Sequence, residues 1–169
     1  MTDSLHGLSA DDAPRAAVVV ASNRAAAGVY EDTTGPLIVE ALQAAGFTVE
    51  EPAVVPDGEP VASAIRAAVD AGARAVLTTG GTGLTPTDRT PEVTRALLDR
   101  EVPGVAEAIR AHGLAKGVPT AALSRGLAGI CGAAFVVNLP GSRGGVEDGL
   151  EVVVPLVRHA VEQVRGSDP

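Results

Sequence analysis

Aromatic residues and lysine are scarce in this sequence of 169 residues. Two Phe, one Tyr and no Trp make up 2% of it, so the core must be aliphatic, although apolar residues together reach 46%. The net charge is −8, and Lys116 is the single lysine among thirteen basic residues. Because a basic surface and aromatic platforms for stacking bases are both missing, the composition argues against nucleic-acid binding.

Cysteine and long apolar runs are also lacking. The lone Cys131 permits no intramolecular disulfide, and no His/Cys spacing typical of a zinc site occurs. No apolar run approaches the roughly 20 residues of a membrane span. The polar start, with Asp3, Asp11 and Asp12, does not resemble an export signal. We therefore expect a cytoplasmic protein with no membrane partner.

Apolar periodicity predicts strands and helices in alternation. Strands are expected at 16–21, 47–55, 75–79 and 135–139, and a small hairpin in the glycine-containing stretch 120–134. Helices are expected from about Pro36, Val61, Thr90 (to about Asp99) and Pro103, and a long C-terminal helix in which Pro155 causes a kink or begins a new helix.

This order of elements predicts an α/β fold with a mainly parallel central sheet. Helices would cover both faces of the sheet, giving three layers α/β/α. We expect one domain over residues 15–165, with a flexible arm at 1–14 and a tail at 166–169. Ligands of such sheets bind at the carboxyl ends of the strands. The segments that follow strands are therefore the candidate sites.

The glycine-rich segment after the strand at 75–79 is the first of these candidates. Gly80, Gly81, Thr82 and Gly83 combine backbone freedom with a hydroxyl group. Their N–H groups are able to form a nest for an anion such as phosphate. The segment is not a Walker A loop, because it lacks the lysine. A tight turn without a ligand is an equally good interpretation of this motif alone.

A second loop of the same kind follows the last strand. It contains Asn138, Pro140, Gly141 and Ser142 and leads into a helix, whose amino end carries partial positive charge. The alternative is a plain helix-entry turn capped by Ser142. Two anion-binding loops at strand ends together indicate a phosphorylated ligand.

Two aspartates occur in the same strand-end segments. Asp57 follows the second strand and Asp88 ends the glycine-rich segment, so both are expected at one edge of the sheet. Because Mg²⁺ commonly takes one or two carboxylates plus substrate phosphates, the pair is a candidate metal site. Each aspartate is equally typical of a turn or a helix cap. Because the chain has only one lysine, the negative charge of a phosphate must be bound by backbone N–H groups, hydroxyls, arginines and metal.

The motifs together resemble the MogA/MoaB family of molybdenum-cofactor biosynthesis. They are A-S-N-R-A-A-A-G-V-Y-E-D-T-T-G-P (21–36), V-V-P-D (54–57), T-T-G-G-T-G-L-T-P-T-D-R-T-P-E (78–92), E-V-P-G (101–104), L-S-R-G (123–126) and N-L-P-G-S (138–142). The resemblance extends over residues 16–164. The sequence departs from the family pattern at Asn23, where many members carry Asp, and at Thr87, where many carry Arg.

The resemblance implies a molybdopterin adenylyltransferase. Such an enzyme transfers AMP from ATP to the terminal phosphate of molybdopterin with Mg²⁺ and releases pyrophosphate. The resemblance also implies a homotrimer and hand-over of the product to a molybdenum insertase. The alternatives are a non-catalytic molybdopterin-binding or scaffold protein of the same family, and a nucleotide-binding regulator.

Motif position implies roles for individual residues as well. Asp57 and Asp88 would be the catalytic and metal-binding carboxylates. The substrate-binding residues would be Gly80, Gly81, Thr82, Gly83, Glu101, Ser124, Asn138, Pro140, Gly141 and Ser142.

Overall fold

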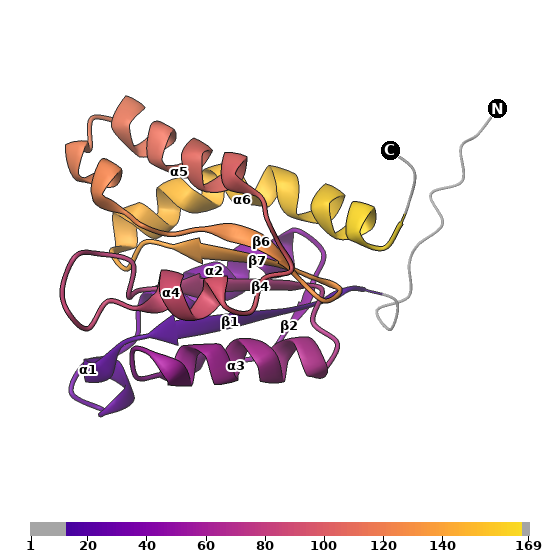
Figure 1. The fold of residues 1–169 in the computed structure, drawn as a ribbon, viewed down its shortest axis with the longest axis horizontal. Helices are drawn as coiled ribbons and strands as arrows, with labels where there is room; N and C mark the ends of the chain where they lie inside the picture. Colours follow the sequence, from indigo (N-terminus) through magenta and orange to yellow (C-terminus); the bar gives the residue numbers. More distant parts are fainter. Residues whose placement is uncertain (1–12, 167–169) are drawn as a thin grey trace.

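A seven-stranded sheet forms the middle layer of the molecule (Figure 1). The computed structural model describes residues 13–166, so most of the predicted arm at 1–14 and of the predicted tail at 166–169 lies outside the described residues. The strands are β1 (Arg15–Ala21), β2 (Thr48–Val49), β3 (Ala53–Val55), β4 (Ala75–Thr79), β5 (Arg100–Glu101), β6 (Ala128–Cys131) and β7 (Ala134–Leu139). Their order is β2-β1-β4-β7-β6-β5, and β3 also pairs with β1.

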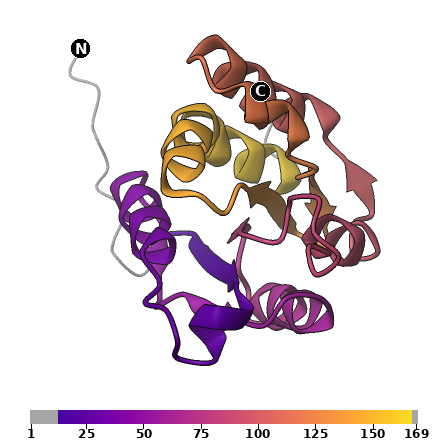
Figure 2. The same ribbon diagram turned by 90° about the vertical axis from the view of Figure 1, so that its left-hand side faces the viewer.

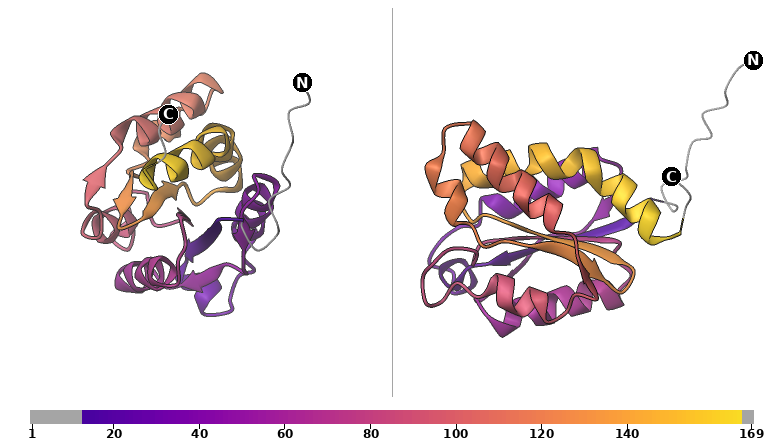
Figure 3. Two further views of the ribbon diagram at one scale, coloured as in Figure 1. Left: turned by 90° about the vertical axis from the view of Figure 1, so that its right-hand side faces the viewer. Right: turned by 45° about the horizontal axis from the view of Figure 1, so that its top comes forward.

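Helices lie on both faces of this sheet, as Figure 3 shows. They are α1 (Asn23–Ala26), α2 (Thr34–Ala44), α3 (Glu59–Asp70), α4 (Thr90–Arg95), α5 (Pro103–Ala115), the short 3₁₀ helix η2 (Pro119–Leu123) and α6 (Arg143–Val164). The helices α2, α5 and α6 pack together over one face, while α3 and α4 cover the other. The predicted three-layer α/β architecture is therefore confirmed.

Successive side chains of the central strands point to opposite faces of the sheet, so the core has two halves. Val18, Leu77 and Val137 point into the cluster under α2, α5 and α6, whereas Val19 and Val76 point into the cluster above α3. The strands β1, β4 and β7 are parallel, and their apolar side chains are buried on both faces. This burial explains the continuous β-branched runs in the sequence. Within residues 13–166, the antiparallel pairs of strands are β5 with β6 and β6 with β7.

Two predicted elements have different limits in the structure. The strand expected at 47–55 is interrupted, since β2 pairs with the beginning of β1 and β3 with its end. Pro52 lies in the interruption, and proline donates no hydrogen bond to a strand ladder. The helix expected to reach Asp99 ends at Arg95, because the N–H groups of Asp99 and Val102 donate to carbonyls of β6 instead.

The hairpin predicted near residues 120–134 is present, but it begins only at Ala128 and extends to Leu139. Pro119–Leu123 form the 3₁₀ helix η2, and the hairpin joins β6 to β7 within the central sheet. Its turn contains Gly132, whose φ of 58° falls in the left-handed region that favours glycine. Pro155 does not begin a new helix, because α6 continues through it to Val164. Among residues 13–166, no helix combines the length and apolar character needed to cross a bilayer.

Candidate active site

The chain turns in opposite directions after β1 and β4, which opens a crevice between their carboxyl ends. The first long helix after β1, α2, lies on one face of the sheet, and α4, which follows β4, lies on the other face with α3. Ligands of open α/β sheets bind at such a switch point. Figure 2 shows this end of the molecule, where the segments that follow β1, β4 and β7 gather.

The two glycine-containing loops touch each other at this edge. The hydroxyl of Thr79 donates a hydrogen bond of 2.7 Å to the carbonyl of Pro140. A Cβ atom added to Gly141 would lie 3.2 Å from the Cα of Gly80, so the two backbones approach too closely for larger residues. The loops that the sequence placed at separate strand ends therefore form one surface.

Asp57 lies beside the glycine loop with one carboxylate oxygen unpaired. Its backbone N–H donates to the side-chain oxygen of Asn23 at 3.0 Å, which fixes the turn after β3. The Oδ1 atom of Asp57 and the hydroxyl oxygen of Thr90 are buried, yet neither has a hydrogen-bond partner. Both atoms face Gly81, where an added Cβ would lie 2.7 Å from Asp57 Oδ1. Unpaired buried polar atoms are rare, and a bound ion is one of the explanations for them.

Asp88 approaches the same loop from its other end. Its Oδ2 atom accepts a hydrogen bond of 3.0 Å from the backbone N–H of Thr85, and an added Cβ at Gly83 would lie 2.8 Å from this oxygen. Burial raises the pKa of Asp57 above its ordinary value, and the negative charge of Asp88 acts in the same direction. The two aspartates are therefore close enough to repel each other, and a cation between them would relieve that repulsion.

A cleft of about 450 Å³, which we call the loop cleft, opens beside the glycine loop. It is lined by Gly81, Thr82, Gly83, Leu84, Asp88, Thr120, Leu123, Ser124, Pro140, Gly141 and Ser142. A second cleft of about 220 Å³, the strand cleft, is lined mainly by polar residues of the crevice, including Ser22, Tyr30, Asp32, Thr34, Thr79, Gly80 and Arg143. Gly141 and Ser142 line both clefts, so the two are neighbours.

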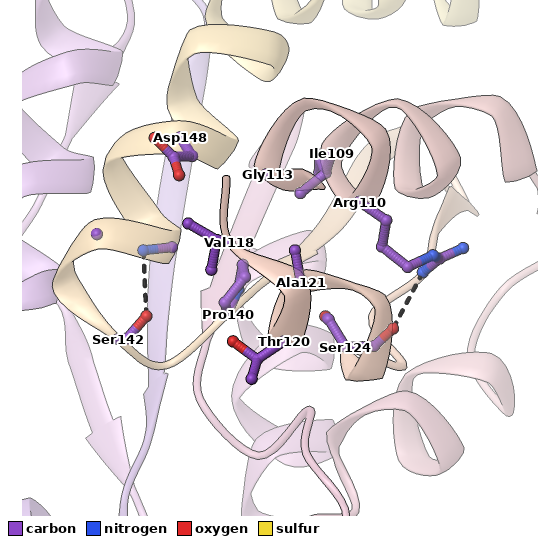
Figure 4. A pocket seen from close by; sticks show the side chains of 12 residues that line it. Ile109, Arg110, Gly113, Val118, Thr120, Ala121, Ser124, Pro140, Ser142 and Asp148 are labelled. Carbon is purple, nitrogen blue, oxygen red and sulfur yellow. Dashed lines mark hydrogen bonds between the residues drawn. The ribbon is translucent and has the colours of Figure 1, made fainter. Parts of the chain in front are cut away.

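A third hollow of about 220 Å³, the helix cavity, continues from the loop cleft. Figure 4 shows it between α5, η2 and the first turn of α6, with Ile109, Val118 and Ala121 on its wall. Ser124, Pro140 and Ser142 line this cavity as well as the loop cleft. A mostly apolar wall next to a polar, glycine-lined wall suits a ligand with a flat ring at one end and phosphate at the other.

Ser142 has a structural role at this position. Its hydroxyl oxygen accepts a hydrogen bond of 3.1 Å from the N–H of Gly145, so it caps the amino end of α6 as the plain-turn interpretation requires. Ser142 lines all three hollows, so the amino end of α6 borders them. A helix end of this kind favours anions.

Two of the ten residues expected to bind substrate are not available at this edge. Asn138 is buried, and its amide group links Leu127, Thr78 and Thr94 through bonds of 3.2, 2.9 and 3.2 Å. Glu101 forms an ion pair of 2.7 Å with Arg95 and lines a different cavity, beside the C-terminal half of α6. The remaining eight line the loop cleft, the strand cleft or the helix cavity.

Sequence reasoning missed several residues of the site. Asn23 was noted only as a departure from a family pattern, and Thr90 only as the start of a helix, whereas both contact the surroundings of Asp57. Arg125 occurs in the L-S-R-G motif without an expected role, but it forms four hydrogen bonds to the segment between Thr82 and Glu92. The usable signal was the position of Asn23, directly after the first strand.

A second group of charged side chains lies on the helical face, where α5 meets α6, and one member, Asp148, also lines the helix cavity. His112 of α5 and Asp148 and Glu151 of α6 have ligand atoms within 4.8 Å of one another. The ammonium group of Lys116 already binds both carboxylates, at 2.6 and 2.9 Å. No companion of His112 was expected from the sequence, because its partners lie about 40 residues further along the chain.

Comparisons with known proteins agree with this geometry. Residues 17–159 match a family model described as "Probable molybdopterin binding domain". The solved structure of the molybdopterin biosynthesis Mog protein from Mycobacterium ulcerans is 52% identical with a TM-score of 0.85, and the match covers 90% of this chain and 99% of that one.

Two curated relatives extend the comparison. The molybdopterin adenylyltransferase of Helicobacter pylori is 37% identical over 157 residues, covering 89% of this chain and 87% of that protein. The molybdenum cofactor biosynthesis bifunctional protein of Chlorobaculum tepidum is 40% identical over 155 residues, covering 90% of this chain and 49% of that protein. The chain thus spans about half the length of the bifunctional relatives it matches.

Proposed function

This chain belongs to the molybdopterin-binding domain family that residues 17–159 match, and on that premise we propose that it is a molybdopterin adenylyltransferase. It transfers AMP from ATP to the terminal phosphate of molybdopterin. The observation that carries the proposal is the buried, unpaired oxygen of Asp57 next to a glycine loop at the strand edge. Relatives named molybdopterin adenylyltransferase, 36–40% identical over most of the chain, support it.

The reaction requires that two anions be brought together. An oxygen of the molybdopterin phosphate attacks the α-phosphorus of ATP, the bond from that phosphorus to the bridging oxygen breaks, and pyrophosphate leaves with the electron pair. The attacking oxygen is already anionic, so neither a strong base nor a covalent nucleophile is needed. Catalysis then depends on positioning and on neutralising charge, as in phosphoryl transfer generally.

Asp57 and Asp88 are the residues that would hold Mg²⁺. The donor set suits this ion, because both side chains offer hard oxygen ligands and one of those oxygens lacks a partner. When bound, Mg²⁺ would neutralise phosphate charge during the transfer. The chain itself holds Asp57 in place through Asn23, and Asp88 through the N–H group of Thr85.

The remaining contacts to substrate come from the two loops and from η2. We assign phosphate groups to the backbone N–H groups and hydroxyls of Gly80, Gly81, Thr82, Gly83, Gly141 and Ser142. Ser124 and Pro140 line both the loop cleft and the helix cavity, and therefore contact the part of the substrate that joins them. Asn138 and Glu101 are left out of this set because of their positions.

Assembly and location are part of the same proposal. The chain acts as a homotrimer in the cytoplasm and hands its adenylylated product to a molybdenum insertase. Sedimentation of the purified protein tests the trimer, and a single species of three times the chain mass is the expected result. A monomer would contradict this part of the proposal without affecting the proposed chemistry.

The decisive experiment incubates the purified protein with molybdopterin and Mg-ATP. We expect adenylylated molybdopterin and an equal amount of pyrophosphate, and neither product when Mg²⁺ is removed with a chelator. Binding of molybdopterin without any AMP transfer would instead support the non-catalytic, scaffold alternative. Binding of nucleotide alone would support a nucleotide-binding regulator.

A further inference from the structure

Arg125 binds the segment that carries Asp88 at several points along its length. Its Nε donates to the carbonyl of Gly83 and its Nη2 to the carbonyl of Asp88, each at 2.8 Å. Its Nη1 pairs with the carboxylate of Glu92 in the first turn of α4. Its backbone N–H donates to the carbonyl of Thr82 at 2.9 Å. We call residues 82–89 the glycine-loop arm. Arg125 thus contacts the beginning and the end of this arm, and also Glu92 in the helix that follows it.

The glycine-loop arm has little else to hold it. Within residues 13–166, its other hydrogen bonds join Thr85 to Asp88 and to Thr87, or Arg89 to the helix that follows. Residues 84–87 are exposed, and the side chain of Leu84 is 65% exposed. A segment with so few contacts opens easily unless an outside group fixes it.

All three nitrogen atoms of the guanidinium group are engaged in these bonds. Burial pushes the pKa of Glu92 upward, but the hydrogen bond from Arg125, a backbone hydrogen bond and the charges of Arg125 and Arg89 together hold the pKa below its ordinary value. The charge of Arg125 is therefore balanced by Glu92 rather than directed at a substrate. The planar fork of arginine suits several fixed acceptors at once, whereas lysine offers one compact charge.

We propose that Arg125 is a positioning residue, which holds the glycine-loop arm so that the carboxylate of Asp88 faces that of Asp57. The inference rests on the proposed function for its catalytic consequence, although the order of the arm is a property of the chain itself. Arg110 extends the support, because its Nη1 donates to the carbonyls of Ser124 and Gly126 on either side of Arg125.

The test compares Arg125→Ala with Arg66→Ala in the full chain. Arg66 is a matched control, since it also forms one exposed ion pair, 3.1 Å from Glu59, but on α3. Amide hydrogen exchange of Thr85 and Asp88 should be about tenfold faster in Arg125→Ala and unchanged in Arg66→Ala. Exchange within β4 should stay the same in both variants. Equal exchange of the arm in all three proteins would overturn the inference.

Kinetic measurements distinguish a positioning role from a general loss of stability. In Arg125→Ala we expect kcat for AMP transfer to fall about tenfold or more, and the Mg²⁺ concentration for half-maximal rate to rise. Added guanidinium ion at low millimolar concentration should restore part of the rate, while methylammonium should not. Arg125→Lys should resemble Arg125→Ala, because one ammonium group cannot replace the fork.

The outcomes separate the inference from the proposed function. A wild type without AMP transfer overturns the proposed function alone, because hydrogen exchange still decides whether Arg125 orders the arm. Faster exchange with an unchanged kcat and Mg²⁺ requirement in an active enzyme overturns the positioning role. A rate loss that methylammonium restores as well as guanidinium does would also overturn it.

Discussion

Two pairs of carboxylates in this chain have opposite surroundings. On the helical face, Asp148 and Glu151 both bind the ammonium group of Lys116, and Glu151 also lies 2.6 Å from His112. At the strand edge, Asp57 has an unpaired buried oxygen and Asp88 accepts a hydrogen bond from its own loop. Among residues 13–166, neither of these two aspartates takes part in an ion pair.

One carboxylate of each pair has a shifted pKa, and the two shifts have opposite directions. Hydrogen bonds from Lys116 and then from His112 lower the pKa of Glu151. Burial and then the charge of Asp88 raise the pKa of Asp57. The only lysine of the chain therefore neutralises acids that join two helices, whereas the negative charge at the strand edge stays uncompensated. Uncompensated carboxylates beside a cleft are typical of functional sites.

The largest effect on AMP transfer is expected when Asp57 and Asp88, which we call the strand-edge pair, lose one charge. Asp88→Asn keeps an oxygen that is able to accept from Thr85, but removes the charge that would help to bind Mg²⁺. We expect AMP transfer to fall by about 100-fold or more, with the melting temperature nearly unchanged. Asp57→Asn should show the same loss. The measurement is product formation at saturating substrates.

A matched change in the helical pair sharpens this comparison. Glu151→Gln removes one charge of the same sign from the pair that Lys116 neutralises. We expect it to leave the rate of AMP transfer within about twofold of the wild type, since Glu151 is paired with Lys116 and His112 and, unlike Asp57 and Asp88, does not lie beside the glycine loop. Equal losses in Glu151→Gln and Asp88→Asn would break the comparison.

The next largest effect is expected when a methyl group at Gly81 crowds the strand-edge pair. Gly81 has a φ of 67°, and an added Cβ would contact both Thr90 Oγ1 and Asp57 Oδ1. Gly81→Ala should lower the free energy of unfolding by about 1–3 kcal/mol, measured by chemical denaturation. Gly28→Ala is the control, because its φ is 73° but nothing lies within 4 Å of the added atom. Equal losses would show that backbone strain alone acts at Gly81.

Removing the cation of the helical pair should have a smaller effect. Lys116→Met leaves Asp148 and Glu151 without their shared ammonium group. Because Lys116 and Glu151 are exposed and Asp148 is only half-buried, we expect the melting temperature to fall by only about 1–3 °C at low salt. The difference should shrink at high salt, where such pairs are screened. A melting temperature that stays the same at low salt would contradict the stabilising role of Lys116.

The smallest expected effect concerns how stability depends on pH. The trend should have opposite signs for variants of the two pairs. The raised pKa of Asp57 means that its contribution to stability is full below about pH 3.8 and is lost as the pH rises through its folded-state pKa. Asp57→Asn should therefore gain stability relative to the wild type as the pH rises from 3.8 toward 7. We expect a difference on the order of 1 °C in melting temperature at pH 7.

Glu151→Gln should show the reverse trend. The lowered pKa of Glu151 means that its contribution is present above about pH 4.5 and is lost as the pH falls through its folded-state pKa. The variant should therefore lose stability relative to the wild type as the pH rises. Parallel curves for the two variants would show that the two pairs do not differ as described.

The family and the three-layer fold were predictable because periodicity and ordered motifs report on the whole chain. The strand pattern at 16–21, 75–79 and 135–139 gave the parallel centre of the sheet, and these strands are β1, β4 and β7. The split of the second strand at Pro52 and the early end of α4 were not predicted. Both depend on which carbonyl groups lie nearby in the folded chain.

The site residues also fall into two groups, those that the sequence predicts and those whose role only the fold reveals. Sequence position alone indicates that Asp57, Asp88 and the two glycine loops lie at strand ends, and the topology then brings them to one edge. It does not reveal that the amide of Asn138 is used up in buried bonds, or that Arg125 faces carbonyls 42 and 37 residues away. Contacts over such separations arise only from the tertiary fold.

Both borders of the sheet are short and charged. On one side the ladder is broken between β2 and β3, where Glu50 and Glu51 are exposed, and on the other side β5 consists only of Arg100 and Glu101. An extended segment from another molecule finds no long run of free N–H and C=O groups to add to. Strand addition between copies of this chain, of the kind that leads to fibrils, is therefore disfavoured in the native state.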